Sequence, residues 1–382
     1  MKVTVSVMGR FHGFNLAYEL ERRGHLQRLI TTYPKFATRK FSIPDSQVSS
    51  LFPIGAATRM LERLPSNQTL KDKALHGLIE FYDRLAARLI PRETEIFTGW
   101  SSSTLHSLKR AKSLGSIAVV DEGSTHALFQ KEIMMQEYDH YGYKPTLASS
   151  GIVERELAEY QEADYILVPS QFVLKTFLDN KIPADKLKVV PYGVDLREFK
   201  PIPKEDDVFR VVFVGALTLR KGVHYLLQAF RELNLPNAEL WLIGSVSAEI
   251  LPFLKKFGNE KIRLKGTFTQ RELFRYYSQG SIFCLPSIEE GMAMVLLQAM
   301  ACGLPVVAST NTGGADLIRD GREGFIVPIR DVEFLKEKIL YCHDHSAQRI
   351  AMGEAALKRV SEEFTWSSYG DRVIQAYQTM LK

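Results

Sequence analysis

Short apolar runs alternate with amphipathic segments along most of the chain, the pattern of parallel strands joined by helices. In the first half we expect strands at residues 3–7, 26–31, 96–98, 117–120, 165–168 and 188–190, with helices at residues 16–23, 71–89, 104–113 and 171–179. A second series covers residues 211–214, 223–233, 239–243, 262–265, 271–277, 282–285 and 306–308, and a helix at residues 366–381 ends the chain. The predicted fold class is therefore α/β, with helices on both faces of parallel sheets.

A break in this rhythm divides the chain into two parts. Two prolines and the charged residues 204–207 have the composition of an interdomain linker. With 382 residues and 45% hydrophobic content, each part can form its own core. We predict two Rossmann-like domains that face each other across a cleft, at residues 1–200 and 207–360. The C-terminal helix, residues 366–382, is expected to pack back on the first domain.

The segment from residue 282 to residue 309 gives the clearest indication of a ligand-binding site. It reads as a buried strand, an acidic turn, an apolar helix and a second buried strand. The turn brings Glu290 to the start of the helix, where unpaired N–H groups and the helix dipole attract anions. We expect these N–H groups to bind phosphates and Glu290 to accept hydrogen bonds from sugar hydroxyls. The N–H groups belong to Gly291, Met292, Ala293 and Met294. A buried helix that binds no ligand is the alternative.

Two adjacent cations follow the first strand of the second half. The segment 215–222 lies between a predicted strand and a predicted helix, and it carries Arg220 and Lys221 just before Gly222. It does not fit the Walker pattern, because Arg220 stands where that pattern has its second glycine. Cations at a helix start oppose the helix dipole, so their presence favours anion binding over a solvated surface pair.

The net charge of +5 is modest but unevenly distributed. Between Arg22 and Arg92 there are 13 Lys or Arg against 5 Asp or Glu, in a stretch that also carries several Phe and Leu residues. Such a surface suits anionic lipid or an acidic acceptor, and a solvated face is the alternative. No segment resembles a nucleic-acid-binding module, so no nucleic-acid partner is expected.

The cysteines and the apolar runs indicate in which cellular compartment the protein is expected. Cys284, Cys302 and Cys342 lack metal-ligand spacing and indicate a reducing environment. The N-terminal apolar run is too short for a signal-peptide core, and the longest uncharged run, residues 291–315, is interrupted by polar residues and a proline. We expect a cytoplasmic protein whose membrane contact is peripheral, on the inner face.

The acidic turn and the helix after it resemble the signature of the retaining glycosyltransferases of family four, also called glycosyl transferases group 1. In that family Glu-Gly is followed by a helix and by a second Glu eight positions after the first. The first Glu corresponds to Glu290, whereas the second position holds Gln298. The resemblance implies that Glu290 contacts the transferred sugar and Gln298 the ribose. A neutral amide predicts weaker nucleotide binding, with activity retained.

Further segments extend this resemblance over most of the chain, and they imply the glycosyltransferase B architecture. The family's diphosphate-binding Lys corresponds to Lys221. Ala216 replaces the Arg that often helps it, so Arg220 is expected to supply the second cation. A His that contacts the donor from the first domain corresponds to His126.

The family's glycine-containing first loop is represented by the residues after the first strand. Gly9 would lie near the donor phosphates, and Arg10 and His12 are candidate acceptor contacts. For His12 a position on the surface is the alternative.

The resemblance implies a retaining, metal-independent transfer of a hexose from a nucleotide diphosphate sugar to a hydroxyl acceptor. No cofactor is expected. Glycolipid or cell-envelope polysaccharide precursors, including lipid-linked ones, are the expected acceptors. The residues assigned to catalysis are Glu290, His126, Lys221 and Arg220. The alternatives are a sugar-nucleotide epimerase of the same fold and a catalytically silent protein that binds nucleotide sugars.

Overall fold

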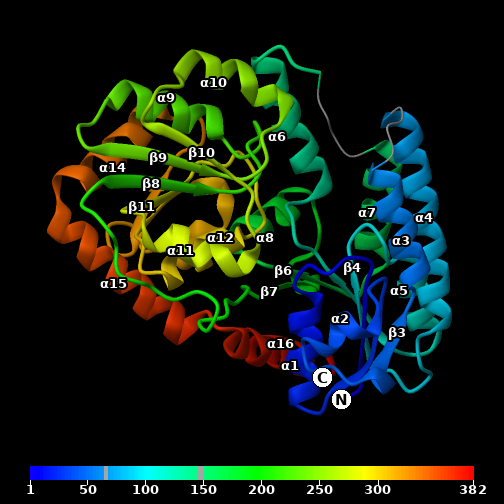
Figure 1. Cartoon of the computed structure of the whole chain (residues 1–382). Helices are drawn as coiled ribbons and strands as arrows, with labels where there is room; N and C mark the ends of the chain where they lie inside the picture. The colour runs from blue at the N-terminus through cyan, green and yellow to red at the C-terminus, as the bar shows by residue number, and fades with distance from the viewer. Residues whose placement is uncertain (64–67, 145–148) are drawn as a thin grey trace.

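A computed structural model describes residues 1–63, 68–144 and 149–382, and it forms two α/β domains, each built on a parallel sheet (Figure 1). The first sheet has seven strands in the order β3-β2-β1-β4-β5-β6-β7. Its strands are β1 (Val3–Val7), β2 (Leu26–Thr31), β3 (Val48–Ser50), β4 (Ile96–Trp100), β5 (Ile117–Asp121), β6 (Tyr165–Val168) and β7 (Leu187–Val189). The second has six strands in the order β10-β9-β8-β11-β12-β13. They are β8 (Phe209–Val214), β9 (Ala238–Ile243), β10 (Ile262–Gly266), β11 (Ile282–Leu285), β12 (Val306–Ser309) and β13 (Gly324–Val327).

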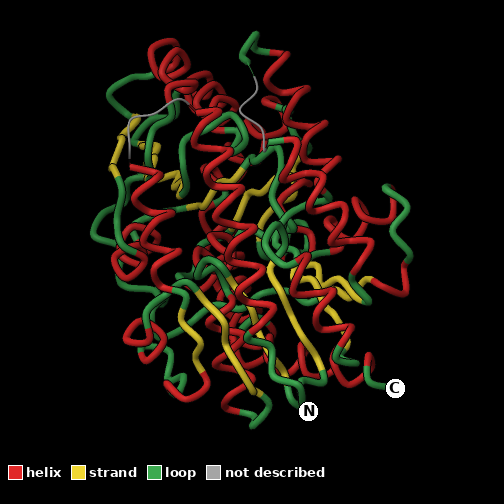
Figure 2. Tube along the Cα trace, turned by 90° about the vertical axis from the view of Figure 1, so that its right-hand side faces the viewer, coloured by secondary structure: helices red, strands yellow, loops and turns green. Residues whose placement is uncertain are grey.

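Helices connect these strands and cover both faces of each sheet; in Figure 2 the strands lie between helices. In the first half they are α1 (Gly13–Arg22), α2 (Lys35–Arg39), α3 (Phe52–Arg63), α4 (Gln68–Arg88), α5 (Leu105–Ser113), α6 (Ala127–His140), α7 (Ser150–Glu162) and α8 (Gln171–Asp179). In the second half they are α9 (Val223–Leu233), α10 (Leu251–Phe257), α11 (Leu273–Ser278), α12 (Met294–Ala301), α13 (Gly314–Leu317), α14 (Val332–Asp344), α15 (Ser346–Glu363) and α16 (Trp366–Met380).

The central strands are buried on both faces, which explains their continuous apolar sequences. Every residue of β1, β4, β8 and β11 is buried. Parallel sheets need helices on both faces, and their strands therefore lack alternation between apolar and polar residues. The predicted parallel α/β fold is confirmed. β3 and β13 lie outside the predicted strands, because β3 is only three residues long and β13 begins with a glycine.

The C-terminal helix α16 returns to the first domain and packs against α1. The hydroxyls of Thr98 and Tyr377 are hydrogen-bonded at 2.6 Å, and Nη2 of Arg23 lies 2.6 Å from Oδ1 of Asp371. Figure 1 shows the two chain ends close together at the base of this domain. None of the helices described is long and apolar enough to cross a membrane.

Helix α6 connects strands of the first sheet but packs against the second domain (Figure 1). The buried carboxylate of Glu137 accepts hydrogen bonds from His224 Nε2 at 2.9 Å, from the Tyr225 hydroxyl at 2.9 Å and from Arg330 Nε at 2.7 Å. Beyond the helix end, the Tyr143 hydroxyl donates to the Glu249 carbonyl at 3.1 Å. The two domains are therefore joined by α6 as well as by the linker.

Candidate active site between the two domains

The acidic turn joins β11 to α12 at the C-terminal end of the second sheet, where open α/β sheets bind ligands. Backbone hydrogen bonds hold it between two neighbouring loops. The Ile288 N–H donates to the Arg220 carbonyl at 2.8 Å, and the Glu290 N–H donates to the Asn311 carbonyl at 2.9 Å. The predicted order of strand, acidic turn, helix and strand is confirmed.

Gly291 lies directly against the backbone of the first domain. A Cβ atom at this position would overlap the carbonyl oxygen of Gly123, which leaves no room for a side chain. The Ser170 hydroxyl also donates to the Gly291 carbonyl at 2.8 Å. A glycine is therefore required here by the close approach of the two domains.

The start of α12 offers N–H groups to a ligand. Within the described chain, no acceptor is found for the N–H groups of Gly291, Met292, Met294 and Val295. For Ala293 the structure corrects the prediction, because its N–H donates to the Thr312 carbonyl at 3.2 Å. Val295 was not among the predicted residues, although it belongs to the first helical turn. These N–H groups form a potential anion site at a helix N-terminus.

Arg220 and Lys221 lie beside the acidic turn. A Cβ atom on Gly222 would overlap the Pro286 carbonyl oxygen, so the two loops are in contact. The Lys221 ammonium forms an ion pair with Oε1 of Glu290. Nη2 of Arg220 lies 3.5 Å from Oε2 of Glu290, and its side chain is 38% exposed. Both cations are thus paired with carboxylates and can still reach a ligand.

Glu289 completes a charged cluster with Arg220, Lys221 and Glu290, although the motif did not indicate it. Its fully buried carboxylate lies 2.8 Å from Nε of Arg220. Burial disfavours a charged carboxylate, but Arg220 and hydrogen bonds from Thr125 and Gln130 outweigh this and lower the pKa of Glu289. Partial burial likewise opposes the charge of Arg220, but Glu290 and Glu289 raise the pKa of its guanidinium. In the sequence, the position of Glu289 directly before Glu290 was the only sign that it belongs to the site.

Gln298 lies on α12 with its side chain almost buried. Its Oε1 accepts a hydrogen bond from the hydroxyl of Tyr277 on α11 at 3.1 Å. This bond orients the amide group, and its nitrogen can still donate hydrogen bonds to a ligand. The expected contact with a ribose stays a prediction.

His126 lies between β5 and α6, just past the C-terminal end of the strand. It is only 2% exposed and is the N-cap of α6, where its Nδ1 accepts from the Leu128 N–H at 3.3 Å. Its ring packs between Tyr160 and Phe177, with ring centroids 5.1 and 5.0 Å away. Burial lowers the pKa of His126 to about 4, so the ring is neutral at pH 7. Its contact with a donor stays a prediction.

The first loop places His12 inside the first domain, so the alternative of a surface position is wrong. Its Nε2 lies 3.0 Å from Oδ1 of Asp121, and its ring contacts Trp100 and Tyr192 at centroid distances of 4.8 and 4.2 Å. Arg10 is exposed, with its guanidinium 4.9 Å from the ring centroid of Phe41.

Gly9 lies in the same loop, next to the exposed ring of Phe11. None of the hydrogen bonds of the described residues joins Gly9, Arg10 or His12 to Glu290. Their predicted contacts with donor and acceptor remain predictions.

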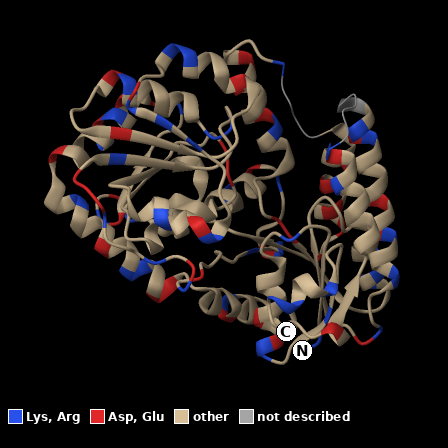
Figure 3. Cartoon of the chain, in the orientation of Figure 1, with Lys and Arg blue, Asp and Glu red and all other residues tan. Residues whose placement is uncertain are grey.

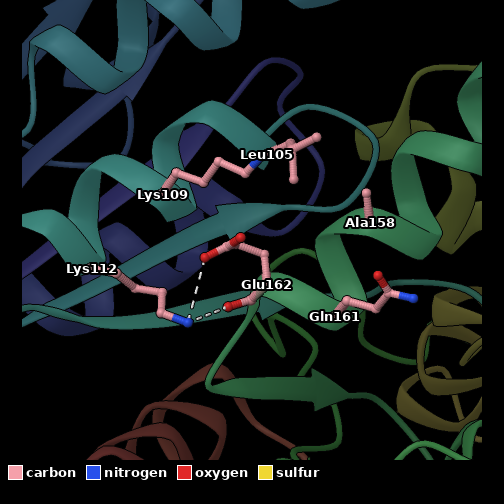
Figure 4. A pocket seen from close by; sticks show the side chains of 6 residues that line it. All are labelled: Leu105, Lys109, Lys112, Ala158, Gln161 and Glu162. Atoms are coloured by element: carbon pink, nitrogen blue, oxygen red, sulfur yellow. Dashed lines mark hydrogen bonds and ion pairs between the residues drawn. The ribbon is translucent and has the colours of Figure 1, made fainter.

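A surface pocket of about 250 Å³ lies elsewhere, between α5 and α7 of the first domain (Figure 4). At its edge Lys112 Nζ lies 3.5 Å from Oε1 of Glu162 and donates to the Glu162 carbonyl at 3.0 Å. Its lining residues are Leu105, Lys109, Lys112, Ala158, Gln161 and Glu162. None of them belongs to the charged cluster, so this pocket is separate from the candidate site.

Two family models match the chain, one for each domain. Residues 11–198 match the model described as Glycosyltransferase Family 4, and residues 208–345 match the model described as Glycosyl transferases group 1. The chain belongs to the family-four glycosyltransferases.

Curated relatives agree with this family. One relative is a GDP-mannose-dependent monoacylated alpha-(1-6)-phosphatidylinositol monomannoside mannosyltransferase of Corynebacterium glutamicum. The chain is 27% identical to it over 240 residues, and the match covers 57% of this chain and 63% of that protein. The chain is also 27% identical over 232 residues to a lipopolysaccharide 1,2-N-acetylglucosaminetransferase of Salmonella typhimurium, covering 54% of this chain and 60% of the relative. The matches thus span less than two thirds of these relatives.

Solved structures show the same fold over the whole chain. The sucrose-phosphate synthase of Thermosynechococcus elongatus matches with a TM-score of 0.70 and 18% identity, covering 100% of this chain and 99% of the other. The Anabaena HepE protein in complex with UDP-glucose matches with a TM-score of 0.72 and 16% identity, covering 99% of this chain and 100% of the other. At these identities the likeness establishes the glycosyltransferase B fold.

Proposed function

We propose that this protein transfers a hexose, with retention of configuration, from a nucleoside diphosphate sugar to a hydroxyl acceptor. The observation that carries the proposal is the placement of Lys221 and Arg220 beside Glu290, next to the unpaired N–H groups at the start of α12. Two cations and a helix N-terminus suit a diphosphate, and the adjacent carboxylate suits sugar hydroxyls.

In the reaction, the bond between the anomeric carbon and the diphosphate oxygen breaks as a bond to the acceptor oxygen forms on the same face of the sugar. Negative charge then grows on the diphosphate, where Lys221, Arg220 and the α12 N–H groups would stabilise it without a metal ion. The acceptor hydroxyl would give its proton to the departing phosphate. The protein thus contributes positioning and electrostatics.

Binding of the donor would rearrange the ion pairs of the free protein. Lys221 and Arg220 are neutralised by carboxylates in this structure, and a diphosphate would compete for the same cations. Once Lys221 turns to the phosphate, the carboxylate of Glu290 becomes available to sugar hydroxyls. This exchange gives Glu290 a role in the free and in the donor-bound protein.

Glycolipid or cell-envelope polysaccharide precursors are the acceptors we propose, since the relatives are named for phosphatidylinositol mannoside and lipopolysaccharide. The first domain has a surface that suits an anionic membrane. Phe36 and Met60 are both 66% exposed, and the cations Lys40 and Arg63 are exposed nearby in sequence. Figure 3 shows Lys and Arg distributed over this domain.

Release of nucleoside diphosphate from a panel of UDP- and GDP-sugars, with and without glycolipid acceptors, tests the proposal. Release that increases with an acceptor and gives a glycosylated product with the donor's anomeric configuration is expected. An inverted product would refute retention. Binding of nucleoside diphosphates without any release would favour the silent binding protein, and conversion to an epimeric nucleotide sugar would favour the epimerase.

A further inference from the structure

Glu289 joins the two domains at the candidate site through both of its carboxylate oxygens. Oε1 accepts from the Thr125 hydroxyl at 2.7 Å, from the Thr125 N–H at 3.3 Å and from the Ser124 hydroxyl at 3.1 Å. Oε2 accepts from Gln130 Nε2 at 3.1 Å and from Arg220 Nε at 2.8 Å. All of these donors except Arg220 belong to the first domain.

Arg220 is held at two points by the acidic turn. Its carbonyl accepts from the Ile288 N–H at 2.8 Å, and its Nε donates to Glu289. The guanidinium nitrogens beyond Nε are left for Glu290 and for a ligand, which fits a side chain that is 38% exposed. A planar guanidinium fixed at Nε has its remaining N–H donors oriented in advance.

We propose that Glu289 is a positioning residue for the transfer reaction, which holds Arg220 in place and makes that placement depend on contact between the domains. The proposal rests on the proposed function. A fully buried carboxylate needs partners, and the first domain supplies most of them. When the domains separate, Glu289 loses Ser124, Thr125 and Gln130 as donors and keeps only Arg220, so the environment of Arg220 changes with closure.

A purely structural link between the domains is the competing explanation, and the chain provides a matched control for it. Glu137 is also fully buried and accepts three hydrogen bonds across the domain contact. Its partners His224, Tyr225 and Arg330 do not include Arg220. A substitution of Glu137 therefore removes a separate contact between the domains and leaves every partner of Glu289, including Arg220, in place.

The test compares Glu289→Gln, Glu137→Gln, Arg220→Ala and the double variant of Glu289 and Arg220. Using the nucleotide sugar that the parent protein turns over, we expect Glu289→Gln to lower kcat roughly 10- to 100-fold with a smaller rise in the donor KM, because the misplaced cation serves both the bound diphosphate and the transition state. Glu289→Asp, which keeps the charge, should recover part of this loss. Glu137→Gln should lower the unfolding midpoint and leave kcat within about twofold.

The decisive measurement is the effect of Glu289→Gln when Arg220 is already alanine. A residue that acts through Arg220 should then change kcat by less than about twofold. An equal loss in both backgrounds, a rise in KM at constant kcat, or the same kcat loss in Glu137→Gln would overturn the proposal. If Glu289→Gln does not fold, Thr125→Val replaces it, since it removes the 2.7 Å donor and keeps the carboxylate.

Failure of the proposed function would be recognised separately. A parent protein that turns over no nucleotide sugar refutes the transferase, and the Glu289 proposal is then decided by calorimetric titration with UDP. A change in UDP affinity caused by Glu289→Gln should largely disappear in the Arg220→Ala background. The same change in both backgrounds, or no change in either, would overturn it.

Discussion

Lys221→Ala is the most direct test of the diphosphate site. The substitution removes the ammonium that pairs with Glu290 and leaves Arg220, 3.5 Å from that carboxylate, as the second cation. Loss of one preorganised transition-state contact costs about 2.7–4 kcal/mol, so kcat should fall about 10²- to 10³-fold. The donor KM should rise as well, because Glu290 is then less neutralised and repels the diphosphate. Release of nucleoside diphosphate measures both constants.

Lys175→Ala is a suitable control for this substitution. The side chain of Lys175 is 72% exposed, and its Nζ lies 2.6 Å from Oδ2 of Asp179 on the surface of α8. Removal of this ion pair should therefore lower the free energy of unfolding by only about 0.3–0.5 kcal/mol. Both variants should keep a cooperative unfolding transition, which shows that the protein is folded. Turnover of Lys221→Ala equal to that of the control would refute the assignment of Lys221 to the diphosphate.

Three further predictions follow from individual contacts. Gln298→Glu keeps an acceptor for Tyr277 and adds a charged oxygen, so calorimetry should show nucleoside diphosphate bound more tightly by roughly 1 kcal/mol; weaker binding would mean that the amide nitrogen donates to the ligand. In the folded protein the pKa of His126 is about 4, whereas in the unfolded chain it is about 6.5. The free energy of unfolding is therefore unaffected by this group above about pH 6.5 and decreases as the pH falls towards 4, because the unfolded chain takes up a proton first. Urea unfolding should show about 2 kcal/mol lost from this group between pH 7 and pH 5, and His126→Asn should lack that component. Lys40→Ser with Arg63→Ser should reduce low-salt sedimentation with phosphatidylglycerol vesicles, at about 1 kcal/mol per charge, whereas Lys255→Ser with Lys358→Ser should not; equal sedimentation or no binding by the parent would contradict the membrane prediction.

The central strands of the sheets could be predicted from the sequence because they are buried on both faces. Runs such as Ile282–Leu285 contain only apolar side chains and Cys, and their predicted bounds agree with the structure. Helix α6 could not be recognised in the same way. Apolar side chains show that a helix is buried but not which domain it packs against. Its attachment to the second domain depends on Glu137, whose partners are 87 to 193 positions away.

The candidate site could be predicted only where neighbouring residues in the sequence carry it. Glu290, Gly291 and the α12 N–H groups follow from one local turn. The side chain of His126 is directed by its role as N-cap of α6, which the strand before it does not reveal. Glu289 illustrates the same limit, since its first-domain partners are 159 to 165 positions away.

The two adjacent carboxylates of the acidic turn have separate surroundings, and this suggests a division of roles. Glu289 is fully buried and hydrogen-bonded by the first domain, so its charge is satisfied before any ligand arrives. Among the described residues, the carboxylate of Glu290 is paired only with Lys221 and Arg220, and both cations would also serve the diphosphate. A donor can therefore displace the partners of Glu290 while Glu289 keeps Arg220 in register. On this reasoning the turn needs both carboxylates, one to respond to the donor and one to hold the cation that the donor meets.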